Sequence, residues 1–173
     1  MADISNSTLL QSNTGILPQD ACVVVIRTEW NAGIVGELEK GCLEALQENG
    51  VSKVRSYTVP GAFEIPFAIK ACWEAARYSD DRPAAFIALG CVTRGDTPHF
   101  DYVCKGVTDG IILLNQSLPV PTIFGILTVD TDEQARERIG GKHGHKGREA
   151  AITALKMIIF QQAVKANSLK IPL

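Results

Sequence analysis

Apolar runs without polar alternation recur along the chain and constrain its fold more than any other feature. Three of them, residues 21–26, 84–89 and 122–127, carry no charged side chain, and a mixed run at 53–59 lies between the first two. A strand that is apolar at successive positions is buried on both faces, and strands that alternate with helices pair in parallel. The sequence therefore predicts an α/β fold, a three-layer αβα sandwich around a four-stranded parallel sheet.

Helical periodicity fills the segments between these runs. One helix face after the first run is formed by Ile34, Leu38, Cys42, Ala45 and Leu46. We expect Asn31 to cap this helix and Asn49-Gly50 to end it. Further helices are expected at 63–78, 99–118, 132–139 and 147–166. Residues 1–19 are polar and aperiodic, which predicts an N-terminal arm ordered against a neighbouring subunit, followed by one domain at 20–173.

The amino-acid composition indicates neither nucleic acid nor a membrane as a binding partner. The 173 residues are 46% hydrophobic and 21% charged, with a net charge of −2, and no basic run indicates nucleic acid as a partner. No apolar stretch reaches the roughly 18–20 residues that cross a bilayer, and the N-terminus lacks a secretory pattern, so no membrane partner is expected. Five scattered cysteines, none in a C-x-x-C pair, indicate reduced thiols and a cytoplasmic protein.

The most informative segment follows the run at 84–89. In an open parallel sheet, ligands bind outside the carboxyl ends of the strands. Here Thr97 and Pro98 are expected to cap and start a helix, and Gly95 lets the backbone approach a ligand. The free amides of such a start bind anions, although the capped helix could also bind nothing. His99 beside them is a candidate proton carrier.

Two other strand ends each allow a functional and a structural interpretation. Glu64 follows a Pro-Gly turn, and its carboxylate could accept hydrogen bonds from a substrate or simply stabilise a helix N-terminus. Trp30 closes the first strand, where its indole could stack on a flat heterocycle or pack in a core or interface.

The glycine-rich segment 138–147 lacks the G-x-x-x-x-G-K-[ST] pattern of a nucleotide-binding loop. His143 and His145 have neither a carboxylate pair nor a cysteine nearby, so no metal site is predicted. A flexible basic loop that meets an anion is the preferred interpretation.

Three motifs together resemble the lumazine synthase family over residues 21–160. They are VPGAFEIP at 59–66, ALGCVTRGDTPHFDYV at 88–103 and PTIFGILTVDTDEQARERIGGKHGHKG at 121–147. The resemblance implies a flavodoxin-like fold, no cofactor, and a step of riboflavin biosynthesis. In that step, 5-amino-6-(D-ribitylamino)uracil and 3,4-dihydroxy-2-butanone 4-phosphate give 6,7-dimethyl-8-ribityllumazine, phosphate and water.

The resemblance also implies roles for particular residues. His99 would transfer protons, and Trp30 would stack on the pyrimidine, where phenylalanine is commoner in the family. Ala62, Phe63 and Glu64 would contact the ribityl chain, and Cys91, Val92 and Thr93 would line the edge of the ring. Asp96, Thr97 and Arg138 would hold the phosphate. Phe124 would complete the pocket of a neighbouring subunit, and Lys146 would add a polar contact. Asp96 would act through its backbone amide, because its carboxylate repels phosphate.

Assembly is a further implication of the resemblance. The family forms homopentamers, which in some members build sixty-subunit shells, and riboflavin synthase is the implied protein partner. The turn IGGKHGHKG at 139–147 carries no insertion, which favours a shell.

Two alternatives stay open at this point. Cys91 could be the nucleophile of a hydrolase with His99 as its base. A non-catalytic flavin or nucleotide carrier is the other, with Trp30 stacking on an isoalloxazine, although the first turn, 27–31, is too bulky for the phosphate loop of a flavodoxin.

Overall fold

A computed structural model of the chain describes residues 7–10 and 21–168. The described strands and helices are, in chain order, β1 (Cys22–Thr28), α1 (Ala32–Glu48), β2 (Lys53–Val59), the 3-10 turn η2 (Ala62–Glu64), α2 (Ile65–Ala76), β3 (Pro83–Thr93), α3 (His99–Ser117), β4 (Thr122–Val129), α4 (Asp132–Arg136), β5 (Ile139–Gly141), β6 (Gly144–His145) and α5 (Lys146–Ser168). None of the helices within these ranges is long and apolar enough to cross a membrane.

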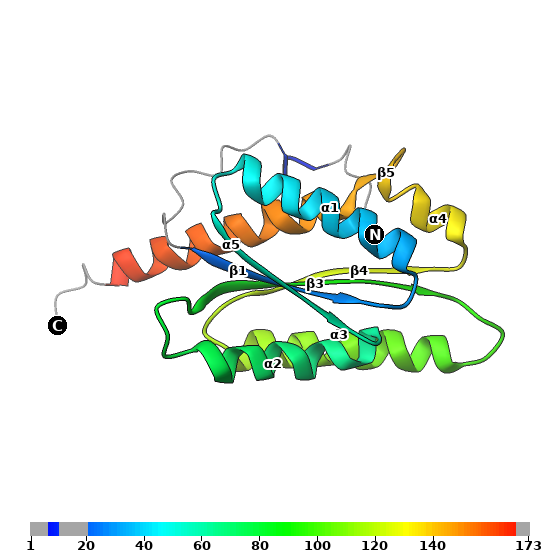
Figure 1. Cartoon of the computed structure of the whole chain (residues 1–173), viewed down its shortest axis with the longest axis horizontal. Helices are drawn as coiled ribbons and strands as arrows, with labels where there is room; N and C mark the ends of the chain where they lie inside the picture. Colours follow the sequence, from blue (N-terminus) through cyan, green and yellow to red (C-terminus); the bar gives the residue numbers. More distant parts are fainter. Residues whose placement is uncertain (1–6, 11–20, 169–173) are drawn as a thin grey trace.

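The main sheet has four parallel strands in the order β2-β1-β3-β4. Figure 1 shows α1 and α5 on one face of this sheet and α2 and α3 on the other. The predicted three-layer α/β sandwich of flavodoxin-like type is thus confirmed.

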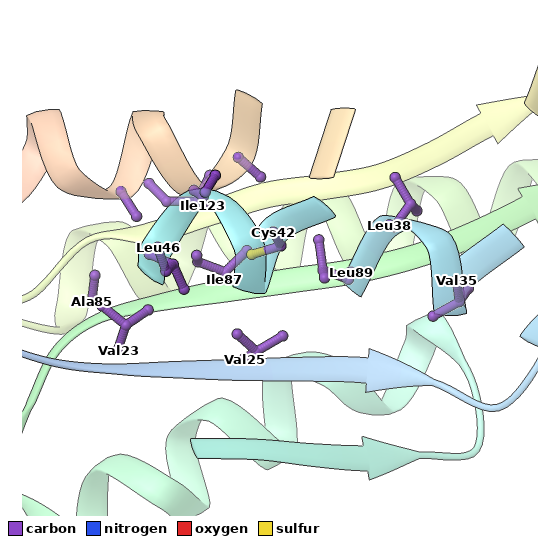
Figure 2. Close-up of a cluster of buried hydrophobic side chains, with 14 of the residues drawn as sticks. Val23, Val25, Val35, Leu38, Cys42, Leu46, Ala85, Ile87, Leu89 and Ile123 are labelled. Carbon is purple, nitrogen blue, oxygen red and sulfur yellow. The ribbon is translucent and has the colours of Figure 1, made fainter. Parts of the chain in front are cut away.

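Each face of the sheet buries its own hydrophobic cluster, which explains why the central strands lack polar alternation. Val23 and Val25 of β1 pack with Leu38 and Leu46 of α1 on one face (Figure 2), whereas Val24 belongs to the cluster on the other. Successive side chains of a strand point to opposite faces, so a strand covered on both sides must be apolar throughout. The edge strand β2 exposes most of its side chains, which accounts for its mixed composition.

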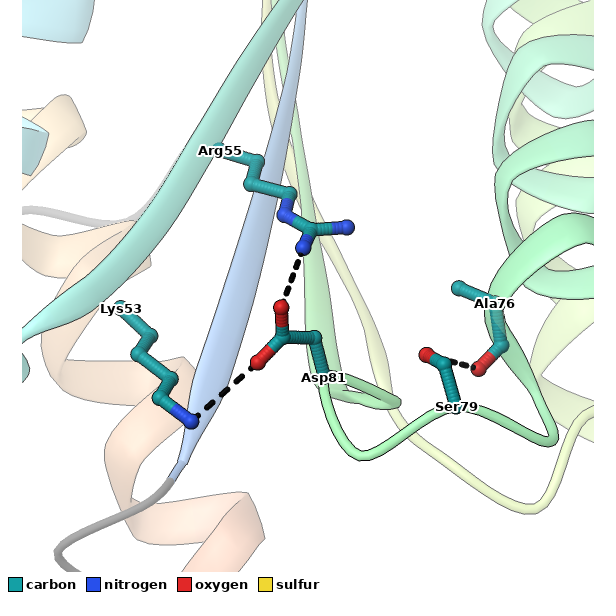
Figure 3. A network of polar contacts seen from close by, with 5 residues as sticks. All are labelled: Lys53, Arg55, Ala76, Ser79 and Asp81. Carbon is teal, nitrogen blue, oxygen red and sulfur yellow. Dashed lines mark hydrogen bonds and ion pairs between the residues drawn. The ribbon is translucent and has the colours of Figure 1, made fainter.

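Ion pairs join the edge strand β2 to the turn that precedes β3. Asp81, in the turn before β3, accepts from Lys53 at 3.2 Å and from Arg55 at 2.6 Å (Figure 3). These two cations, Lys53 first, hold the pKa of the Asp81 carboxyl below its usual value. The contact fixes the end of the sheet that is remote from the strand carboxyl termini.

Three local predictions are wrong, and a fourth is confirmed only in part. Asn31 occupies the N-cap of α1 as predicted, but its side chain makes no capping bond. Pro98 rather than Thr97 is the N-cap of α3. The helix predicted at 132–139 ends at Arg136. A β5–β6 hairpin then replaces the predicted flexible loop, because glycines at positive φ turn the chain at Gly140 and Gly144.

The predicted arm falls mostly outside the described residues. Within 7–10, the carbonyl of Leu9 accepts from Lys156 of α5 at 2.5 Å. The domain limits and the ordering of the arm on a neighbour stay predictions.

His145 places an imidazole under α1 at the point where the hairpin enters α5. A Cβ at Gly41 would lie 2.2 Å from the imidazole Cε1, so only glycine leaves room for the ring. The imidazole Nδ1 is buried without a hydrogen-bond partner among the described residues. Burial first, and then Arg148, lower the pKa of His145, while Glu37 and Glu44 of α1 oppose the shift.

This burial predicts an acid-sensitive contribution to stability. Because the folded state favours the neutral imidazole, the unfolded chain binds the extra proton, and stability should be complete above the ordinary pKa of 6.5 and fall as pH drops below it. We expect His145→Asn to flatten this part of the curve of unfolding free energy against pH, measured by urea unfolding between about pH 5 and 8. Parallel curves for the two proteins would contradict the burial effect.

Candidate active site

A pocket of about 570 Å³ opens at the carboxyl ends of the parallel strands. Its lining comes from the β1–α1 turn, the β2–α2 segment, the end of β3 and the first turns of α3, through Trp30, Asn31, Gly61, Ala62, Phe63, Glu64, Cys91, Val92, Thr93, His99, Tyr102 and Val103. This is the edge at which an open parallel sheet binds ligands. Eight of the predicted site residues are therefore brought together here.

The side chains of Trp30 and Glu64 both lie close to Gly61 in the wall of this pocket. The amide of Trp30 donates to the carbonyl of Pro60 at 3.4 Å, which joins the ends of β1 and β2. A Cβ built on Gly61 would lie 3.0 Å from a Glu64 carboxylate oxygen and 3.5 Å from the indole of Trp30. The indole is 73% exposed, so its face is available to a flat ligand.

Asn31 is a lining residue that the sequence interpretation assigned only to capping. It is the one non-glycine residue with positive φ in the described part of the chain, at φ 57° and ψ 42°. Its side-chain amide donates to the carbonyl of Cys91 at 2.8 Å. Asparagine tolerates the left-handed conformation better than other side chains, and that tolerance was the available signal. Asn31 thereby joins the Trp30 turn to the end of β3.

Cys91 lines the pocket and is only 4% exposed. Burial raises the pKa of the thiol, and the nearby Asp132 adds to this, although the hydroxyl of Thr93 opposes it. A protonated thiol is a poor nucleophile. These surroundings weigh against the hydrolase alternative and favour a role for Cys91 as part of the pocket wall.

His99 is the first residue of α3 and faces the pocket with Tyr102, one turn further along the helix. The amides of Asp101 and Tyr102 bond the carbonyl of Pro98, so those of the residues before them have no partner within the helix. Sequence reasoning missed Tyr102, although its spacing of three from His99 places both on one helix face.

Five predicted site residues do not line this pocket: Asp96, Thr97, Phe124, Arg138 and Lys146. Phe124 is 41% exposed on the edge strand β4. Arg138 donates to the carbonyl of Gln134 at 2.6 Å, and the ammonium of Lys146 is buried against Glu149 at 2.7 Å. The described residues contain no cluster of three or more potential metal ligands.

The architecture is that of a flavodoxin-like α/β protein with a pocket at the carboxyl ends of its strands. The profile of the 6,7-dimethyl-8-ribityllumazine synthase family matches residues 20–162. The chain belongs to this family, whose members are transferases of riboflavin biosynthesis.

Named relatives agree with this assignment. The 6,7-dimethyl-8-ribityllumazine synthase of Porphyromonas gingivalis is 50% identical over 141 residues, covering 80% of this chain and 84% of that protein. The enzyme of the same name from Bacteroides fragilis is 46% identical over 79% of this chain and 93% of its own. That of Christiangramia forsetii is 40% identical over 93% of this chain and 95% of its own.

The conformation of Asn31 predicts different costs for two substitutions. Asn31→Gly keeps the left-handed backbone and loses one hydrogen bond, so unfolding free energy should fall by about 1 kcal/mol. Asn31→Ala also places a β-carbon in the left-handed region and should lose roughly 1–2 kcal/mol more. Urea unfolding measures both variants. Equal midpoints for them would contradict a backbone role for the asparagine.

Proposed function

We propose that this chain condenses 5-amino-6-(D-ribitylamino)uracil with 3,4-dihydroxy-2-butanone 4-phosphate to give 6,7-dimethyl-8-ribityllumazine, phosphate and water. The observation that carries the proposal is one pocket in which an exposed indole, a carboxylate and a histidine converge, from Trp30, Glu64 and His99. In this proposal, the pyrimidine stacks on Trp30 and meets Cys91, Val92 and Thr93 at its edge. The ribityl chain lies along Ala62, Phe63 and Glu64.

The chemistry asks for alignment and proton movement more than for a protein nucleophile. The pyrimidine amine attacks the ketone and a first water leaves to give an imine. Phosphate is then eliminated, the resulting enol tautomerises to a ketone, and the ribitylamino nitrogen attacks this ketone to close the ring with loss of a second water. Holding two substrates in contact supplies much of the rate enhancement in such a reaction. His99 moves the protons. The backbone amides of Asp96 and Thr97, together with Arg138, hold the phosphate, for which a planar guanidinium is suited.

The site is completed, in this proposal, by a second subunit. Phe124, Arg138 and Lys146 lie outside the pocket of their own chain, and Phe124 is exposed on an edge strand. In a cyclic assembly, a residue that completes the site of a neighbouring subunit lies outside the pocket of its own chain. We therefore propose a homopentamer as the functional unit. The short β5–β6 hairpin favours its assembly into a sixty-subunit shell, with riboflavin synthase as partner. Five free cysteines fit a reducing, cytoplasmic setting.

Product formation tests the reaction, and His99→Ala tests the proton carrier. Mixing both substrates with the purified protein should produce the absorbance of the lumazine. His99→Ala should slow turnover about ten-fold or more, because general acid–base catalysis is lost. His143→Ala is the matched control, because His143 lies outside the pocket beside Glu137, and should retain the wild-type rate.

A yellow protein without turnover would instead support the flavin carrier, for which the exposed Trp30 provides a stacking surface.

A complementation assay tests the shared site. Arg138→Ala should raise the KM for the butanone phosphate about ten-fold or more, because a charge-assisted hydrogen bond is lost, whereas Arg136→Ala on the same segment should not. When His99→Ala and Arg138→Ala chains are co-assembled, about one quarter of shared sites would contain both intact residues, and activity should reappear. Mixtures no more active than the two separate variants would contradict a site built from two chains.

A further inference from the structure

Arg94 lies between the end of β3 and the segment that carries the proposed phosphate contacts. Its backbone amide donates to the carbonyl of Val129, the last residue of β4, at 2.9 Å. The side chain is 45% exposed and does not line the pocket. Arg94 is thus placed beside the site without belonging to its wall.

The guanidinium of Arg94 joins two elements at once. Its Nε donates to Asp130 at 2.8 Å, beyond the end of β4, and its Nη1 donates to Asp101 in the first turn of α3 at 3.2 Å. It also stacks over the ring of Phe100, with 4.1 Å from the guanidinium carbon to the ring centroid. A planar group with donors along several edges can pair with two carboxylates while its face covers a ring, which an ammonium cannot do.

The start of α3 has no side-chain cap, since neither Thr97 nor Pro98 makes a capping bond. Arg94 instead connects the residue before the segment 95–98 to the two residues after His99. The ends of this short segment are therefore held by one side chain. The same guanidinium anchors them to Asp130, whose amide bonds the side chain of Gln134 at 2.8 Å.

We propose that Arg94 is a positioning residue, which fixes the segment 95–98 and the first turn of α3 so that His99 and the phosphate-binding amides keep their mutual geometry. The inference rests on the proposed function and adds to it a residue that contacts no substrate. Exposed ion pairs contribute little to stability. The consequence of losing Arg94 is therefore a displaced His99, with folding almost unaffected.

The test compares Arg94→Met with Arg77→Met. Arg77 is a matched control, because it also stacks on an aromatic ring, that of Tyr78 at 4.6 Å, and pairs with a carboxylate, that of Glu74 at 3.2 Å, but it lies at the C-terminal end of α2. Arg94→Met should lower kcat about ten-fold, as expected for a misplaced catalytic group, and raise the KM for the uracil substrate less than about two-fold, since Trp30 and Glu64 are untouched. Arg77→Met should leave both parameters unchanged.

A double variant separates positioning from a general structural role. If Arg94 acts through His99, then Arg94→Met added to His99→Ala should slow the reaction little beyond His99→Ala alone. The proposal would be overturned if the double variant showed the product of the two single losses in kcat, or if Arg94→Met left kcat unchanged. A rise confined to the KM of the butanone phosphate would also overturn it, because Arg94 would then be a phosphate ligand. If Arg94→Met fails to fold, Arg94→Lys replaces it, because lysine keeps the charge but not the planar guanidinium. The results that support or overturn the proposal are then the same as for Arg94→Met.

Hydrogen exchange distinguishes failure of this inference from failure of the proposed function. In Arg94→Met, amides of residues 95–103 should exchange faster than in wild type, whereas those of α2 should not change. A wild-type protein that forms no lumazine would defeat the proposed function, and the exchange comparison would still decide the role of Arg94. Unchanged exchange over 95–103 would overturn it.

Discussion

Parallel pairing of the four strands is the constraint on which the rest of the molecule depends. It brings every strand carboxyl end to one edge, and backbone bonds continue the pairing beyond the strands: Glu29 to Val59 at 2.9 Å, and Arg94 to Val129 at 2.9 Å. Residues from three separate strand–helix connections therefore meet at this edge. The hydrophobic clusters on both faces keep the sheet in this register, because a slip would expose one set of side chains.

Much of the fold could be predicted from the sequence because burial on two faces leaves a direct trace in composition. The strands β1, β3 and β4 were located in this way, and β2 was located despite its mixed pattern, which its edge position explains. The β5–β6 hairpin was not foreseen. Its strands are only three and two residues long, so they show no periodicity, and its turns depend on glycine conformations that composition alone does not fix.

Only those residues of the candidate site that closely follow a strand in sequence could be predicted. Trp30, Glu64 and His99 could be found because each follows a strand by a short, readable interval. The partners of Asn31 and Arg94 could not be predicted, because Cys91 and Asp130 lie 60 and 36 residues away and a hydrogen bond at that separation leaves no local pattern. The tolerance of asparagine for the left-handed conformation indicates a turn at Asn31 but not its partner. Arg138 and Phe124 stay predictions for another physical reason: the surface they are expected to complete belongs to another chain.

On the aromatic side of the pocket, apolar surface that could stabilise the fold stays exposed to solvent. Trp30, Phe63 and Tyr102 are each more than 60% exposed, an arrangement that leaves apolar area in water which folding would otherwise bury. Glycines support it from behind: a Cβ at Gly106 of α3 would lie 2.5 Å from the ring of Phe63, so that ring can approach the helix only where the side chain is absent. A flat substrate placed between such rings recovers the exposed area on binding. In the proposed reaction, the hydrophobic contribution withheld from folding would serve to align the pyrimidine against His99, while the hydrophobic clusters on both faces of the sheet stabilise the chain.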